Sequence, residues 1–418
     1  MTNTTTEPLL RSHLGGVTLL LLLTLCTSAT QAKRLSVLEV MHLTNDYFIR
    51  QHPDAGAPTF VKKERPSNLW TRGVYFEGLC ALNAIDPKPQ NTAYIMQWAN
   101  AHKWTPRNGI GTRDADDYCC SQSYLDLYEH PLKGEQPSLE WINPTVACME
   151  NLIDHVGDTP DPENTGKFNG SSLHDWFWID AIQMGLPVLT RLARIQYVRT
   201  GDPTFAQRYA DQGWNMYVWS RDTLAGGLFN KAEGLWWRDA DFVPPYREPN
   251  GRNCYWSRGN GWVYAALVRA MDDATLANGA KAPWNTHYDA YLADYKAMTE
   301  ALVACQRSDC FWNVSLHDQS NFGGPELSGT ALFIYGMAWG VRHGVLPAKK
   351  YMPIIRKTWN AMVKTCVHTN GFLGYVQGTG KEPKDSQPVT YTTQPDFDDY
   401  GLGCLLLCGS ELYLLGIK

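Results

Sequence analysis

One acidic residue within an apolar helical segment is the first candidate for chemistry. Asp180 lies in the segment Trp178-Ile-Asp-Ala-Ile-Gln-Met184, where most neighbours are apolar. Burial among such neighbours strips water from a carboxylate and raises its pKa, which suits a general acid near neutral pH. The same pattern also fits a capping or ion-paired aspartate, and the sequence leaves both interpretations open.

A second group of carboxylates precedes another predicted helix. Asp114, Asp116 and Asp117 enter a segment that continues as Ser121-Gln-Ser-Tyr-Leu-Asp126. Carboxylates at a helix N-terminus are favoured by the helix dipole, so capping alone could explain them. A cap can still place one carboxylate in a cleft, and two carboxylates from different helices could divide acid and base roles or hold a water molecule.

The segment Cys254-Tyr-Trp-Ser-Arg-Gly-Asn-Gly-Trp262 combines glycines with groups that recognise ligands. Glycines are costly at the start of a helix unless something approaches the backbone closely. The planar fork of Arg258 suits a substrate carboxylate, and Trp256 and Trp262 could form a wall on which a sugar ring stacks. The alternative is a packed helix entry with a structural arginine.

Two further segments lead into predicted helices, and several common motifs are missing. Glu326, in Gly323-Gly-Pro-Glu-Leu-Ser-Gly-Thr330, is either a cap or a residue facing the same rim, whereas the glycines of Tyr400-Gly-Leu-Gly403 favour close helix packing. The histidines form no metal-binding set. Neither a phosphate-binding glycine loop nor a Gly-x-Ser-x-Gly elbow occurs.

These residues lie in a chain whose apolar spacing of three and four predicts helices throughout. Some segments, such as Trp176–Ile179 and Leu402–Leu407, are apolar on nearly all faces, and others, such as 203–221, are amphipathic. This difference predicts an inner and an outer ring. We therefore expect one all-α domain, an (α/α)6 barrel of about twelve helices. A solenoid of helix pairs is the alternative, although no fixed repeat is visible. The long connections 222–255 and 367–398 would gather at one rim and build a cleft. The predicted helices are 36–52, 70–86, 90–103, 117–130, 137–157, 175–199, 203–221, 256–275, 285–307, 326–344, 349–366 and 399–414.

Composition and the N-terminus indicate where such a protein works. The net charge of −5 argues against a nucleic-acid-binding protein. Residues 1–32 have the layout of a secretory signal peptide, so we expect an exported domain over 33–418, periplasmic or secreted. No later stretch reaches the roughly 20 apolar residues of a membrane span. Export permits disulfides, and Cys305 and Cys310 could pair, but we expect most cysteines to be buried free thiols.

Four elements in this order resemble the unsaturated uronyl hydrolases of glycoside hydrolase families 88 and 105, most closely the unsaturated rhamnogalacturonyl hydrolases of family 105. They are the Trp-x-Asp-x-x-x-Met-x-x-Pro element around Asp180, Tyr255-Trp-Ser-Arg-Gly-Asn-Gly-Trp262, Pro325-Glu-Leu-Ser-Gly-Thr330 and Tyr400-Gly-Leu-Gly403. The resemblance covers about residues 36–416. It implies an (α/α)6 barrel without a metal or organic cofactor. It also implies exo-action on the unsaturated non-reducing end of an oligosaccharide made by a polysaccharide lyase.

The resemblance also implies roles for single residues. Asp180 matches the family's catalytic aspartate, and Asp116 or Asp117 its second acidic residue. Trp178, Trp256 and Arg258 match pocket positions. Asp180 would protonate C4 of the double bond, after which water adds at C5.

One position of this sequence departs from the pattern of the unsaturated uronyl hydrolases. Arg238 stands near the point where relatives often have a histidine, and it adds positive charge beside the pocket. The source polysaccharide and the oligomeric state stay open. An inverting glycosidase acting on saturated glycosides, with carboxylates about 6.5–9.5 Å apart, and an exported glycan-binding protein are the rival functions.

Overall fold

The structure is a computed structural model that describes residues 35–61, 63–154, 168, 170–276 and 278–418. Residues Leu35–Lys418 belong to one compact unit. The predicted signal peptide, residues 1–32, lies outside the described residues and stays a prediction.

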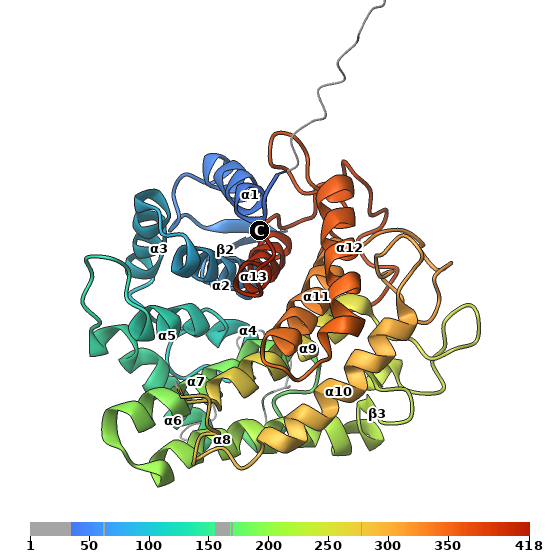
Figure 1. The fold of residues 1–418 in the computed structure, drawn as a ribbon. Coiled ribbons are helices and arrows are strands. Elements are labelled where there is room, and N and C mark those ends of the chain that lie inside the picture. Colours follow the sequence, from blue (N-terminus) through green and yellow to red (C-terminus); the bar gives the residue numbers. More distant parts are fainter. Residues whose placement is uncertain (1–34, 62, 155–167, 169, 277) are drawn as a thin grey trace, which may run out of the picture. The chain divides into compact units, whose positions relative to one another are not determined.

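Six helices form a closed inner ring (Figure 1). Each contacts the next in chain order, and the last contacts the first. The predicted (α/α)6 barrel is thereby confirmed. These helices are buried on most faces, as expected for elements enclosed by an outer ring. The inner helices are α2 (Trp70–Ile85), α5 (Ser121–Glu129), α7 (Asp180–Thr200), α9 (Ser257–Asp273), α11 (Leu327–Arg342) and α13 (Tyr400–Leu414).

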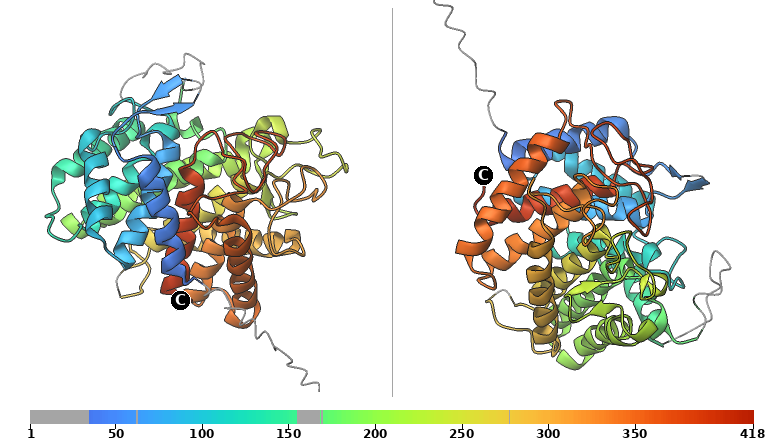
Figure 2. Two further views of the ribbon diagram at one scale, coloured as in Figure 1. Left: turned by 90° about the horizontal axis from the view of Figure 1, so that it is seen from above. Right: turned by 90° about the vertical axis from the view of Figure 1, so that its right-hand side faces the viewer.

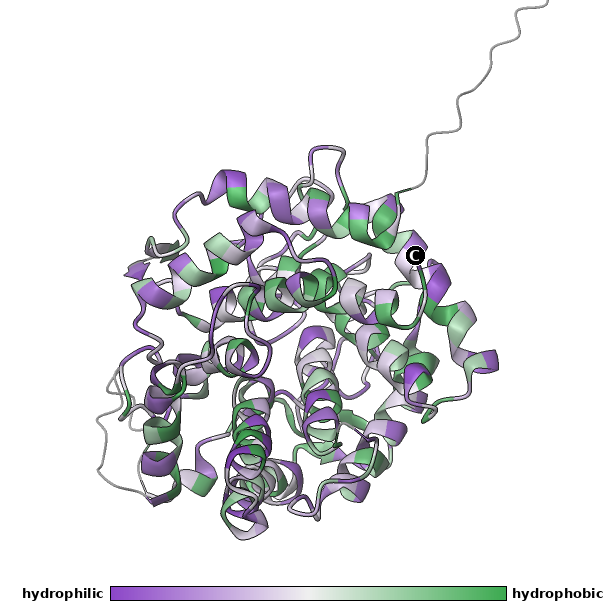
Figure 3. Ribbon diagram, turned by 60° about the vertical axis from the view of Figure 1, so that its left-hand side comes forward, coloured by the Kyte–Doolittle hydropathy of each residue, from purple (hydrophilic) through white to green (hydrophobic). Residues whose placement is uncertain are grey.

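The outer ring consists of helices that bury one face only. In Figure 1 they lie around the inner helices, and in the left view of Figure 2 the outer helix α1 runs beside the inner helix α13. In Figure 3 ribbons at the periphery alternate between hydrophilic and hydrophobic colours. This alternation is the amphipathic pattern that helical spacing predicts. The outer helices are α1 (Val37–Gln51), α3 (Pro89–Ala101), α6 (Asn143–Asp154), α8 (Pro203–Val218), α10 (Tyr288–Cys305) and α12 (Ala348–Cys366).

Three predicted helices are divided or begin late in the structure. The segment 137–157 contains a separate short turn, Leu139–Trp141, before α6 begins at Asn143. The segment 117–130 divides into α4 (Ala115–Tyr118) and α5, and the backbone between them lies against Gly73, where an added Cβ would be 3.3 Å from Cys120 N. The segment 175–199 becomes helical only at Asp180, because Trp178 pairs as an antiparallel bridge with Asp239.

Short strands and turns, which the helical pattern did not predict, complete the described chain. The hairpin β1 (Thr59–Val61)/β2 (Lys63–Arg65) pairs Phe60 with Glu64, and β3 (Phe229–Asn230)/β4 (Leu235–Trp236) pairs Phe229 with Trp236. The remaining short helical turns are η1 (Leu139–Trp141), η2 (Ser172–His174), η3 (Trp219–Thr223), η4 (Leu224–Gly226) and η5 (Ala240–Phe242).

Glycines let two neighbouring inner helices touch through their backbones. A Cβ on Gly403 of α13 would collide with the carbonyl group of Val74 in α2, and a Cβ on Gly78 would lie 2.6 Å from Gly403 O. The expected packing role of Tyr400-Gly-Leu-Gly403 is therefore confirmed. Larger residues at either position would push α2 and α13 apart.

The cysteines of the described residues are all unpaired. Nine of these ten thiols are buried, and Cys310 is partly exposed. This agrees with the expectation of buried free thiols, and Cys305 and Cys310 are not bonded. Among the described helices, none combines the length and apolarity that a membrane span requires.

Candidate active site

The first turns of the inner helices meet at one end of the barrel, which we call the near mouth. Thr71 and Arg72 at the start of α2 donate to Asp399, the N-cap of α13. A Cβ on Gly329 of α11 would lie 3.2 Å from Arg258 N in α9. Because each helix N-terminus carries partial positive charge, this mouth favours anionic groups.

Long connections cross the near mouth and contact each other, as predicted for 222–255 and 367–398. Tyr246 donates to Glu382 over 2.9 Å, and Lys381 lies 3.2 Å from Asp241. Ser315, on the connection between α10 and α11, donates to Glu248. The expected gathering of these loops at one rim is confirmed.

Asp180 is the first residue of α7 and lies at this mouth. Its side chain is 11% exposed, and its Oδ2 accepts a hydrogen bond of 3.2 Å from Arg238 Nε. Burial raises the pKa of the Asp180 carboxyl, while the charges of Arg238 and Arg258 act to lower that pKa. Asp180 is thus a nearly buried carboxyl that keeps a narrow contact with solvent.

The loop that carries Arg238 is fixed to the start of α7. Ile179 N donates to Arg238 O over 3.0 Å, and Trp178 forms a bridge with Asp239. Arg238 Nη1 in turn donates to Asp239 Oδ2 over 2.6 Å. These contacts aim the guanidinium at Asp180, and its side chain remains 21% exposed.

The structure distinguishes Asp116 from Asp117, the two neighbouring aspartates that the sequence left as alternatives. Asp117 is fully buried and bonded to Arg107 at 2.6 Å, Thr112 at 2.6 Å and Asn108 at 2.9 Å. Asp116 is partly exposed and carries no such partners. Burial raises the pKa of Asp116 well above its usual value, and the negative charges of Asp114, Asp180 and Asp117 raise it further. Asp116 is therefore the aspartate that interacts with Asp180, whereas Asp117 anchors its own loop.

Arg258 and Trp256 are more enclosed than the sequence suggested. The two terminal nitrogens of Arg258 donate to Gln377 O and Gly378 O, both at 2.7 Å, and the guanidinium lies over the rings of Trp256 and Tyr400. Trp256 Nε1 donates to Gln377 Oε1 over 2.9 Å. Arg258 therefore holds the 367–399 connection over the mouth. This is the structural role that the sequence analysis gave as the alternative to binding a substrate carboxylate.

Three further predicted site residues are packed against protein. Trp262 is fully buried beside Trp70 and does not offer an open stacking face. Glu326 caps α11 by accepting from the backbone of Ser328 and Gly329. Trp178 is 7% exposed, so it keeps only an edge at the mouth. The ring-stacking wall expected from Trp256 and Trp262 is therefore not exposed in this structure.

Two positioning residues escaped the sequence analysis. Asp239 holds Arg238, and its only sequence signal is adjacency to that arginine. Gln377 accepts from Trp256 and also supports Arg258 through its carbonyl group, yet it lies in a loop without a recognisable pattern. Within the described parts of the chain, no three His, Cys, Asp or Glu side chains are grouped to hold a metal ion.

Comparisons with known proteins agree with this architecture. Two curated relatives are both named "Unsaturated 3S-rhamnoglycuronyl hydrolase". The one from Formosa agariphila is 28% identical, covering 83% of this chain and 84% of its own length; the one from Alteromonas sp. is 29% identical, covering 84% and 79%. A solved structure titled as a glycosyl hydrolase of family 88 from Bacteroides vulgatus superposes with a TM-score of 0.72 at 25% identity, covering 90% of this chain and 97% of that one.

The family model described as Glycosyl Hydrolase Family 88 matches residues 40–415, which is nearly the whole described chain. That match includes Asp180, Arg238, Arg258 and both loops over the near mouth. The chain therefore belongs to glycosyl hydrolase family 88 and is a glycoside hydrolase.

Proposed function

We propose that this protein is an exo-acting unsaturated uronyl hydrolase. It releases the 4,5-unsaturated uronic acid from the non-reducing end of oligosaccharides that a polysaccharide lyase has produced. The observation that carries the proposal is the arrangement of two interacting carboxyls, Asp180 and Asp116, with one arginine, Arg238, at the near mouth. Family membership and the names of the two curated relatives support the same reaction class.

The proposed reaction begins with protonation of carbon. Asp180 delivers its proton to C4, the π electrons form the new C–H bond, and an oxocarbenium-like centre develops at C5. Water adds to C5 and returns a proton to the Asp180 carboxylate, so one residue acts as acid and then as base. The resulting hemiketal opens to a ketone, and the hemiacetal at C1 then releases the remaining oligosaccharide as an alcohol.

Asp116 supplies the second half of the acid–base pair. Its pKa is raised more strongly than that of Asp180, which Arg238 and Arg258 hold lower. Because interacting carboxyls titrate as a pair, their raised pKa values favour a proton at the site that Asp180 can receive. We expect Asp116 also to orient the attacking water or a ring hydroxyl.

Arg238 is the proposed partner of the substrate carboxylate. It is nearly buried, yet exposed enough to be reached, and in the resting site it contacts Asp180 and Asp239. A substrate carboxylate that pairs with Arg238 draws the cation away from Asp180. The pKa of Asp180 then rises, so binding the correct anionic sugar favours the protonated acid that the reaction requires.

The sugar next to the cleaved bond follows from the relatives. Their shared name specifies a rhamnoglycuronyl group, and we accordingly propose a rhamnosyl unit at that position. The N-terminal pattern supports export, so we propose that the enzyme acts outside the cytoplasm on fragments released there. N-terminal sequencing of the exported protein tests this, with cleavage expected after Ala32.

A panel of lyase digests tests the function directly. The ultraviolet absorbance of the conjugated double bond should fall as the enzyme acts, and the shortened oligosaccharide should appear in equal amount. The matched control is the same oligosaccharide with a saturated terminal uronate, which should not be cleaved. Cleavage of the saturated substrate would indicate an inverting glycosidase, rising absorbance a lyase, and binding without turnover a glycan-binding protein.

A further inference from the structure

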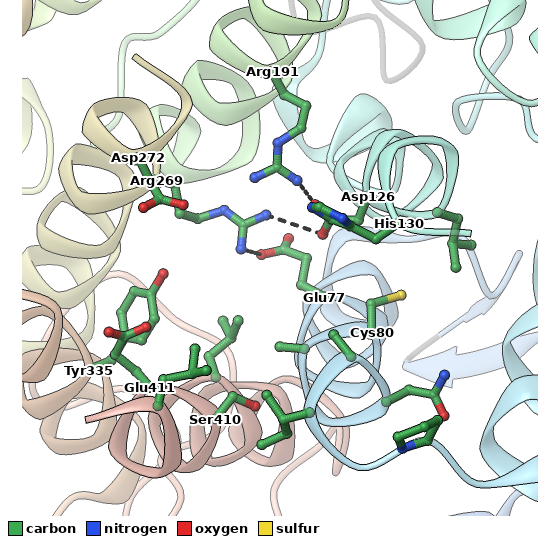
Figure 4. A pocket seen from close by; sticks show the side chains of 18 of the residues that line it. Glu77, Cys80, Asp126, His130, Arg191, Arg269, Asp272, Tyr335, Ser410 and Glu411 are labelled. Carbon is green, nitrogen blue, oxygen red and sulfur yellow. Dashed lines mark ion pairs between the residues drawn. The ribbon is translucent and has the colours of Figure 1, made fainter. Parts of the chain in front are cut away.

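The inner ring encloses a cavity of about 550 Å³ at the end opposite Asp180. We call this the far-mouth cavity. It lies where the inner helices end, and its wall includes residues of α2, α5, α7, α9, α11 and α13 (Figure 4). Its volume falls within the range of about 300–1,000 Å³ that small-molecule sites occupy.

One buried arginine that lines this cavity, Arg269, donates no hydrogen bond to any of the described residues. The side chain of Arg269 is 7% exposed, and its nearest charged partners are Glu77 at 3.6 Å and Asp126 at 3.7 Å, both beyond hydrogen-bond distance. The Nε and Nη2 atoms of Arg269 have no hydrogen-bond partner. In Figure 4 the guanidinium extends into the space between Glu77 and Asp126.

These unpaired donors can bind oxygen atoms of a molecule in the cavity. A guanidinium carries five N–H donors, and each buried donor left unmet costs about 1–3 kcal/mol. Tyr335, another wall residue, has a hydroxyl group that forms no hydrogen bond to the described residues. An occupant can therefore present acceptors to Arg269 and either a donor or an acceptor to Tyr335.

The charges of the wall decide against a simple ion. Its four acidic side chains are matched by four basic ones: Glu77, Asp126, Asp272 and Glu411 against Lys133, Arg191, Arg269 and Arg342. The C-terminal ends of the inner helices add partial negative charge, which disfavours an anion. A cation would be repelled by Arg191 and Arg269, which extend into the cavity (Figure 4). A neutral molecule avoids both penalties.

Hydroxyl groups fit this wall because each can accept and donate. They can accept from Arg269 and donate to the carboxylate of Asp126, whose side chain is 20% exposed. Leucine side chains also line the cavity and can contact the C–H surfaces of a sugar ring: Leu127, Leu132, Leu407 and Leu414.

We propose that the far-mouth cavity is a second binding site, which takes a neutral monosaccharide or a polyol of similar size. Arg269 and Tyr335 donate to ligand oxygens, and Asp126 accepts from ligand hydroxyls. The site is separate from the near mouth and does not depend on the reaction proposed there.

Calorimetric titration of the full-length protein with glucose, rhamnose and myo-inositol tests the proposal. We expect saturable binding of at least one of them. Ala84 is an exposed residue of the cavity wall, so Ala84→Trp should fill the entrance without disturbing buried charges and weaken binding by at least about tenfold, which corresponds to about 1.4 kcal/mol. Arg269→Gln should weaken it similarly if the variant folds. Asp180→Asn, at the opposite mouth, is the matched control and should bind as the wild type does.

Several outcomes would overturn the proposal. One is the absence of saturable binding for all three neutral probes, which would mean that water alone fills the cavity. Binding of sodium sulfate or tetramethylammonium chloride without any neutral probe would show an ion site instead. Binding that survives Ala84→Trp but is lost in Asp180→Asn would place the sugar at the near mouth.

Discussion

The two mouths of the inner ring place arginines and carboxylates together in opposite ways. At the far mouth, Asp273 accepts from Arg191 at 2.8 Å and lies 3.2 Å from Arg194. At the near mouth, Asp180 and Asp116 interact with each other and share the field of Arg238. At the far mouth a buried acid is paired with two cations, whereas at the near mouth three acids, Asp180, Asp116 and Asp239, lie around one hydrogen-bonded cation.

The pKa directions follow this difference in pairing. Burial acts to raise the pKa of Asp273, but Arg191 and Arg194 outweigh it and hold that pKa below its usual value. Burial also raises the pKa of Asp116, and the neighbouring acids raise it further. Helix N-termini at the near mouth should lower these pKa values, so desolvation and like charges outweigh the dipoles there. The far mouth favours the charged form of Asp273, whereas the near mouth favours the protonated forms of Asp116 and Asp180.

Removing the proposed acid should give the largest effect on the reaction. Asp180→Asn should lower kcat by about 10²–10⁴, because the amide cannot donate and recover a proton in the same way. The absorbance assay on the preferred lyase fragment measures this loss. The thermal midpoint should stay at or above that of the wild type, because the buried carboxyl no longer needs to lose its water. A folded variant with near-wild-type kcat would remove Asp180 from the mechanism.

Removing the paired acid at the far mouth should cost stability instead. Asp273→Asn removes a fully buried carboxylate that pairs with both Arg191 and Arg194. Glu129 still pairs with both arginines, so we expect unfolding to become easier by about 3 kcal/mol, the lower end of the range for a broken buried ion pair. Denaturant titration at neutral pH measures this change, and kcat should be unaffected at temperatures where the variant is folded.

The pH dependence of this loss has a definite sign. The folded pKa of Asp273 lies below the usual 3.8, so its stabilising effect is complete above that pH and is lost as pH falls through the folded pKa. The gap between wild type and Asp273→Asn should therefore narrow in acid. A constant gap from neutral pH into strong acid would contradict the pairing described here.

Changing the arginine of the near mouth should produce a smaller effect with a diagnostic pH signature. Arg238→Gln removes the proposed carboxylate partner, and kcat/KM should fall about 10–100-fold, as expected for a charged hydrogen bond. Because Arg238 lowers the pKa of Asp180, its loss should also move the alkaline limb of kcat/KM to higher pH. A rise in KM with an unmoved limb would show that Arg238 binds substrate without tuning Asp180.

The ring of helices could be predicted because the buried side of each helix repeats apolar residues every three or four positions in the sequence. The all-round apolar helix around Leu402–Leu407 and the amphipathic segment 203–221 appear in the inner and outer rings as expected. The expectation failed where a tertiary contact replaced local preference, as at residues 175–179, where pairing of Trp178 with Asp239 delays the helix to Asp180.

The site was less accessible to sequence reasoning, because its geometry depends on loops distant in the chain. The family resemblance placed Asp180 and Arg238 beside one pocket, but nothing local could show that Arg258 donates to the backbone of Gln377 and Gly378. Adjacent aspartates also look alike in sequence. Only the fold shows that Asp117 is enclosed by Arg107 and Thr112 while Asp116 interacts with Asp180.

The smallest effect on stability and activity should come from a position that belongs to neither mouth. This substitution is a control for the larger effects predicted above. Asp202 caps the outer helix α8 by accepting from Thr204 N and Phe205 N. Asp202→Ala should cost about 1 kcal/mol of unfolding free energy, seen as a small drop in the denaturation midpoint. Both kcat and its pH profile should match the wild type, because no mouth residue contacts this cap. If Asp202→Ala moved the alkaline limb of the kcat/KM profile as Arg238→Gln does, the shift would reflect a general destabilisation of the barrel. The contrast between a near mouth that favours protonated carboxyls and a far mouth that pairs charges would then fail.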